Sequence, residues 1–136
     1  MPMNQKLFAG LAIAIAFAMP ASAADKIKVG LITKFPVPFY STMEDAAKKY
    51  AASHPEIELV TGKGQAATDI EGQIALIESM ITQGVKGLAI TPVDPTVAPA
   101  LDKAVAAGIK VVLVDNSIPD WKGQTALVST NNLNGG

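Results

Sequence analysis

The sequence contains no cysteine, no arginine and a single histidine, His54. Without cysteine the chain can form neither a disulfide framework nor a thiolate metal site, and one histidine leaves little for a zinc cluster. The chain also lacks the GxSxG, GxxxxGK[ST] and HExxH motifs and a second histidine that could act as a base. These absences indicate a protein that is not an enzyme and that needs no metal or other cofactor.

Excess positive charge is absent as well. Eleven basic residues, all of them lysines, face twelve acidic ones, and the formal net charge is −1. Nucleic acids and anionic lipids bind surfaces with a basic excess. We therefore expect no nucleic-acid partner.

The first 23 residues have the pattern of a secretory signal peptide. Lys6 gives a positive start, residues 7–19 form an apolar run, and Ala21 and Ala23 are the small residues of a cleavage site. An apolar run of thirteen residues is too short to span a bilayer, which takes about 20 residues. The sequence predicts an exported domain that begins near residue 24. A compact, cysteine-free domain with an export signal suggests a bacterial periplasm or cell surface.

The remaining chain alternates between strand and helix patterns. Apolar runs predict strands at 27–32, 57–61, 85–91, 109–114 and 125–129, and three-to-four spacing predicts helices at 41–54, 68–84 and 95–108. This alternation is typical of an α/β fold, a doubly wound parallel sheet with right-handed crossovers. We expect the strand order 2-1-3-4-5, which places the first and third strands beside the switch point.

Local signals predict the starts and the buried faces of the helices. Ser41 with Glu44, and Thr68 with Glu71, fit capping boxes, while Asp94-Pro95 fits an N-cap followed by proline. The expected buried stripes are Met43, Ala46, Ala47, Tyr50 and Ala51 in the first helix, Ile70, Ile74, Ile77 and Ile81 in the second, and Val97, Leu101 and Val105 in the third.

Residues 62–67 form a GxGxxA string between a strand and a helix, as the dinucleotide-binding fingerprint does. The match is weak because the string follows the second predicted strand and not the first. A flexible loop is the favoured interpretation, and a dinucleotide-binding enzyme is the weaker alternative.

Aromatic and polar residues gather where the predicted strands end. Phe39 and Tyr40 follow the first strand, Thr91 ends the third, and Asp115 and Asn116 end the fourth. These ends meet at one edge of a parallel sheet, where open α/β folds bind ligands. Rings can cover the C–H faces of a sugar or polyol while carboxylate and amide groups bond its hydroxyls. The simpler alternatives are that the rings cap the core and that Asp115-Asn116 is only a turn.

Five features in this order resemble the ribose-type periplasmic sugar-binding proteins. They are the export signal, the run 38–40 (PFY), the strand ends 90–94 (ITPVD) and 114–116 (VDN), and the run 131–136 (NNLNGG). The resemblance covers residues 25–136. It implies a two-lobed periplasmic receptor that closes on a sugar and feeds an ABC importer, with the inner-membrane permease as a partner. A module that reports the sugar to a chemoreceptor is the alternative.

The resemblance also implies roles for individual residues. Phe39 and Tyr40 match the ring pair that packs on the sugar, Asp115 matches the aspartate that bonds its hydroxyls, and Thr91 stands where ribose receptors have asparagine. Asn116 stands where arginine is common, which argues against ribose itself. Lys34 could supply a cation from the first loop, or it could point into solvent.

Because the family has two similar lobes, the resemblance implies that this sequence is a fragment. Residues 24–130 would form the N-terminal sugar-binding lobe. Residues 131–136, with Asn131 and Asn132, would begin the hinge that crosses to the second lobe.

Overall fold

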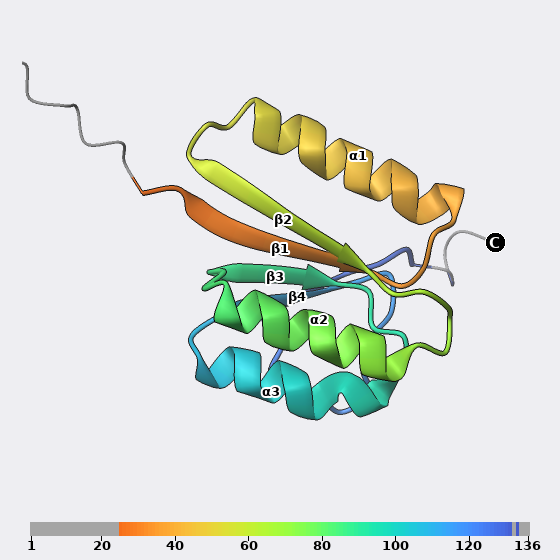
Figure 1. Cartoon of the computed structure of the whole chain (residues 1–136). Coiled ribbons are helices and arrows are strands. Elements are labelled where there is room, and N and C mark those ends of the chain that lie inside the picture. The colour runs from red at the N-terminus through yellow and green to blue at the C-terminus, as the bar shows by residue number, and fades with distance from the viewer. Residues whose placement is uncertain (1–24, 132, 134–136) are drawn as a thin grey trace, which may run out of the picture.

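The computed structural model describes residues 25–131 and residue 133 (Figure 1). Five strands form one parallel sheet in the order β2-β1-β3-β4-β5, as predicted. The strands are β1 (Ile27–Thr33), β2 (Ile57–Lys63), β3 (Gly87–Ile90), β4 (Lys110–Val114) and β5 (Ala126–Val128). The expected signal peptide, residues 1–23, and Asn132 lie outside the described residues.

Helices cover both faces of the sheet. Figure 1 shows α1 (Pro38–Ala52) on one side, and α2 (Ile70–Thr82) and α3 (Ala98–Ala106) together on the other. A 3₁₀ turn, η1 (Pro95–Val97), leads into α3, and Asp94 caps it by accepting from the Thr96 N–H at 2.8 Å. Because all five strands are parallel, their carboxyl ends lie along one edge of the sheet.

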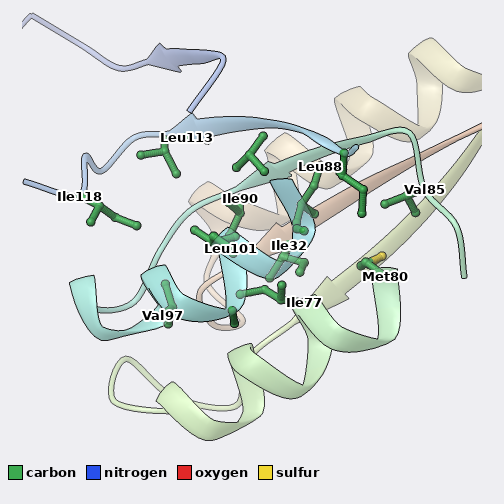
Figure 2. Packing of buried hydrophobic residues seen from close by; sticks show 14 residues of the cluster. Ile32, Ile77, Met80, Val85, Leu88, Ile90, Val97, Leu101, Leu113 and Ile118 are labelled. Atoms are coloured by element: carbon green, nitrogen blue, oxygen red, sulfur yellow. The ribbon is translucent and has the colours of Figure 1, made fainter. Parts of the chain in front are cut away.

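The hydrophobic core lies between the sheet and the pair α2 and α3 (Figure 2). Ile32, Ile90 and Leu113 occupy matching register positions on β1, β3 and β4, and all three are fully buried. They pack in one cluster with Ile77 of α2 and Leu101 of α3. Burying each such side chain contributes about 1.5–3 kcal/mol, so this layer holds the strand ends in place.

The first helix differs from the prediction at its start. It begins at Pro38, three residues before the expected cap at Ser41, because a proline's fixed φ suits the first turn of a helix. Glu44, the expected capping-box partner of Ser41, is instead buried together with Tyr40. The predicted buried stripe is wrong at Ala46 and Tyr50, which are exposed, while Met43, Ala47 and Ala51 are partly buried.

Two details of the other helices also correct the prediction. The cap of α2 is Asp69 and not Thr68, because the Asp69 carboxylate accepts from the backbone N–H groups of Gly72 and Gln65, at 3.0 and 2.9 Å. Val105, expected to point inward, is 37% exposed. A strict four-residue spacing from Val97 drifts around a helix of 3.6 residues per turn, which carries Val105 away from the core.

The glycines of residues 62–67 serve packing. Gly64 donates its N–H to the Thr33 carbonyl at 3.2 Å, and a Cβ on Gly64 would lie 2.4 Å from the carbonyl oxygen of Lys34. Only glycine permits that approach. The segment that was expected to be a flexible loop is therefore anchored: its first two residues end β2, and Asp69 binds Gln65.

Candidate functional site

Two hydrogen bonds join the residues that follow β1 to the end of β4: one starts from the loop and the other from the first turn of α1. The Tyr40 hydroxyl donates to Asp115 Oδ2 at 3.3 Å, and Lys34 Nζ donates to Asn116 Oδ1 at 3.0 Å. Strand β3 lies between β1 and β4, and its end is marked by Thr91. The structure thus pairs Tyr40 with Asp115 and Lys34 with Asn116, while Thr91 follows the strand between them.

Asp115 is held in a strained backbone conformation. Its φ is 66°, and the Asn116 N–H donates to the Val114 carbonyl at 2.8 Å, which closes a γ-turn around Asp115. The Asp115 N–H donates to the Val128 carbonyl at 2.8 Å and ties this turn to β5. Holding a residue other than glycine at a positive φ costs about 1–3 kcal/mol, and residues with such backbone strain cluster at functional sites.

A groove of about 250 Å³ lies beside this turn. It is lined by Phe39, Met43, Val114, Asp115, Val128, Ser129 and Thr130. Phe39 is 60% exposed and meets the Tyr40 ring edge-on, with ring centroids 5.1 Å apart. An accessible aromatic ring and a carboxylate therefore face the same groove, together with two hydroxyl side chains.

A second hollow, of about 230 Å³, lies between α1 and the sheet. Its lining is apolar apart from Tyr50 and contains no charged or amide side chain. A polar solute would lose its hydrogen bonds to water there, so this hollow does not suit a sugar.

Thr91 is fully buried, and its hydroxyl has no hydrogen-bond partner within the described part of the chain. Its carbonyl accepts from Gln73 Nε2, and Gln73 Oε1 accepts from the Val93 N–H, both at 2.9 Å. Gln73 on α2 thereby fixes the bend that follows β3. Our sequence reasoning missed Gln73, although a polar residue within an isoleucine stripe was a usable signal.

Glu44, expected from the sequence to cap the first helix, has a different role in the structure. It is 5% exposed, accepts from the Thr33 hydroxyl at 2.8 Å and lies 3.5 Å from Lys63 Nζ. These contacts offset the cost of removing the Glu44 carboxylate from water, and they connect α1 to the ends of β1 and β2. The available signal was that Glu44 follows Tyr40 by one helical turn, on the same face.

Asn131 is exposed and does not join the cluster. Its Oδ1 accepts from the Leu133 N–H at 3.1 Å. Asn132 lies outside the described residues, so the hinge role of both residues stays a prediction. Among the residues that the structure describes, no group of three His, Cys, Asp or Glu side chains could hold a metal ion, and no helix is long and apolar enough to cross a membrane.

The environment of Tyr40 makes its ionisation a test of the site. Burial, then the charge of Asp115 and the hydrogen bond to it, raise the pKa of Tyr40 above its ordinary value. The folded state therefore keeps a proton that the unfolded chain releases near pH 10, so this contribution to stability is present below about pH 10 and is lost as the pH rises through the folded pKa.

Replacing Tyr40 by Phe removes that titration. We expect the free energy of unfolding to fall less steeply with pH in Tyr40→Phe than in the wild type, between about pH 9 and 11. Urea unfolding at a series of pH values measures both slopes. Equal slopes would contradict a pKa of Tyr40 that is raised by burial and by Asp115.

Comparison with known proteins identifies the family to which the chain belongs. Residues 29–136 match the family model "Periplasmic binding protein domain". The D-ribose/D-allose-binding protein of Pseudomonas aeruginosa is 39% identical over 102 residues, which cover 73% of this chain and 32% of that protein. The multiple sugar-binding periplasmic receptor ChvE of Rhizobium radiobacter is 36% identical over 116 residues, which cover 82% of this chain and 32% of that protein.

A solved structure gives the same result. The ABC transporter solute-binding protein of Burkholderia graminis, in complex with D-arabinose, superposes with a TM-score of 0.71 at 31% identity, and the match covers 82% of this chain and 38% of that one. This chain spans about a third of the length of the curated relatives that it matches. Its sheet corresponds to one lobe of such a protein, and the family match replaces the dinucleotide-binding interpretation of residues 62–67. The chain belongs to the periplasmic binding proteins, a family of solute-binding proteins that are not enzymes.

Proposed function

We propose that this chain is the N-terminal lobe of a periplasmic receptor that binds a sugar or polyol for an ABC importer. The observation that carries the proposal is the groove in which the Phe39 ring and the Asp115 carboxylate face the same space. An apolar ring can cover the C–H face of a sugar while a charged acceptor bonds its hydroxyls. Asn116 and Lys34 would add further polar groups nearby, whereas the Thr91 side chain is fully buried in this chain and lies outside the groove.

The relatives support this solute class. They include receptors for D-ribose and D-allose and for several sugars, and a solved structure holds D-arabinose. On this proposal residues 1–23 are the signal peptide, residues 24–130 the lobe and residues 131–136 the start of the hinge. The receptor works in the periplasm, and its macromolecular partner is the permease in the inner membrane.

An exchange hybrid tests the proposal. Residues 25–131 of this chain replace the segment that they match in the P. aeruginosa D-ribose/D-allose-binding protein, whose remaining length supplies the rest of a receptor. We expect the hybrid to be stabilised against heat by at least one member of a panel of pentoses, hexoses and polyols. A hybrid that melts cooperatively but responds to no compound would refute the proposal.

The exposed ring gives a specific prediction in that hybrid. Phe39→Ala should weaken sugar binding by about 1–3 kcal/mol, because it removes an apolar face that the solute would desolvate. Since Phe39 is 60% exposed, its loss should change the unfolding free energy little. Calorimetry measures the affinity, and Tyr50→Ala, at a similarly exposed ring on the far end of α1, is the control. Unchanged affinity in Phe39→Ala would show that this ring does not contact the solute.

A further inference from the structure

Two phenyl rings pack on the ring of Tyr40, and one of them belongs to Phe35. Phe35 is partly buried in the loop between β1 and α1, and it is not among the residues that line the groove. Its ring meets the Tyr40 ring edge-on, with centroids 5.5 Å apart and an interplanar angle of 82°. The Phe39 ring meets Tyr40 in the same manner, at 5.1 Å and 75°.

Tyr40 itself does not line the groove, but its hydroxyl reaches a residue that does. Tyr40 is 6% exposed, whereas Phe39, the residue before it, is 60% exposed and lines the groove. The Tyr40 hydroxyl donates to Asp115 Oδ2 at 3.3 Å. The three neighbouring rings therefore differ in role: Phe39 faces the groove, and Tyr40 acts on the groove through Asp115.

The backbone of Asp115 is fixed, but its side chain can still rotate. The γ-turn and the bond to Val128 hold the backbone. The torsion about the Cβ–Cγ bond of aspartate is broad, so this torsion alone does not fix where the two oxygens point. The hydrogen bond from Tyr40 to Oδ2 selects one orientation. The position of the Tyr40 hydroxyl thus decides how the carboxylate is presented to the groove.

The position of that hydroxyl depends in turn on the direction of the Tyr40 ring. Aromatic pairs at centroid distances of about 4.5–7 Å favour an edge-on arrangement, so the contact with Phe35 favours a defined ring direction. Phe35 starts from a fixed backbone, because Gly64 packs on the Lys34 carbonyl and leaves no room for a Cβ. The contact of 3.3 Å is longer than the about 2.5–3.0 Å of most O–H···O bonds, so a small change in the ring direction would break it.

We propose that Phe35 is a positioning residue, whose ring directs the Tyr40 hydroxyl onto Asp115 and thereby sets the orientation of the carboxylate in the groove. Phe35 acts through Tyr40 and does not contact the solute. Its effect on solute binding rests on the proposed function, because Asp115 belongs to the same groove. The contacts among the three side chains exist without any solute, so they can be tested separately.

The first test needs no solute, because Tyr40 can be observed alone. The chain has two tyrosines, so in Tyr50→Phe the ultraviolet absorbance of tyrosinate reports only Tyr40. Burial, and then the charge of Asp115, raise the pKa of Tyr40. We expect Phe35→Leu to lower the pH at which Tyr40 ionises, because its hydroxyl then moves away from Asp115. Circular dichroism at each pH confirms that the chain stays folded.

Two comparisons separate positioning from a simple loss of burial. In Asp115→Asn, which removes the charge, Phe35→Leu should have no further effect on the ionisation of Tyr40. Pro36→Ala, at an exposed residue of the same loop, should leave the ionisation of Tyr40 unchanged. The inference is overturned if Phe35→Leu changes nothing, or if it lowers the pH of ionisation equally with and without the Asp115 charge.

The second test measures solute binding in the exchange hybrid. Phe35→Leu should weaken the binding of the best sugar of the panel about fivefold, although leucine keeps an apolar side chain in the loop. In the Asp115→Ala background the same change should cost about twofold or less, because the carboxylate that Phe35 positions is gone. Equal losses in the two backgrounds would overturn the inference alone. A folded hybrid that binds no compound of the panel would overturn the proposed function, and the ionisation of Tyr40 would still decide the role of Phe35.

Discussion

Asp115→Ala should weaken sugar binding in the exchange hybrid by about 2 kcal/mol or more, roughly thirtyfold. The carboxylate lines the groove, and its removal leaves solute hydroxyls without a charged acceptor after water has been excluded. It also leaves the Tyr40 hydroxyl without its partner. Isothermal titration calorimetry with the best sugar of the panel measures the change.

A second substitution at the same position separates binding from backbone strain. Asp115→Gly removes the same carboxylate, so affinity should fall by a similar amount. Glycine accepts a φ of 66° without the cost that aspartate bears, so the free energy of unfolding should stay level or rise by about 1 kcal/mol. If Asp115→Ala binds normally while Asn116→Ala does not, the choice of Asp115 as the principal acceptor is wrong.

Gln73→Leu should lower the free energy of unfolding by about 2–4 kcal/mol. The fully buried Gln73 amide bonds the Thr91 carbonyl and the Val93 N–H, and leucine leaves both backbone groups unpaired. Each unpaired buried group costs about 1–3 kcal/mol. Urea unfolding of the chain measures the loss.

The control for this prediction is Gln65→Leu, because Gln65 is exposed and only its backbone N–H is bonded. Its effect should stay within about 0.5 kcal/mol. The bend after β3 would also loosen in Gln73→Leu, so sugar affinity in the exchange hybrid should fall although Gln73 does not line the groove. Equal unfolding free energies for the two variants would show that the bend does not depend on Gln73.

Some features of the candidate site could be predicted from the sequence, and others could not. Asp115 and Asn116 could be placed at the end of β4 from the sequence, because an apolar run that stops at two polar residues marks a strand end. The strained γ-turn at Asp115 could not be predicted from the sequence, since aspartate is common in ordinary turns as well. From the sequence Lys34 could point into solvent or into the site, and only the tertiary structure shows that it bonds Asn116.

The sequence by itself determined the order of helices and strands and indicated a parallel sheet, because the periodicity of apolar residues is a local property. The strand order 2-1-3-4-5 was expected from the fold class alone, and the structure confirms it. The tertiary structure alone decided which polar residues of the helices turn inward. Glu44 and Gln73 can be buried because each forms a hydrogen bond with a residue distant in sequence. Glu44 accepts from the Thr33 hydroxyl, and Gln73 donates to the Thr91 carbonyl. Helical periodicity shows which face a residue lies on, but only long-range contacts show whether a polar group on that face finds a partner.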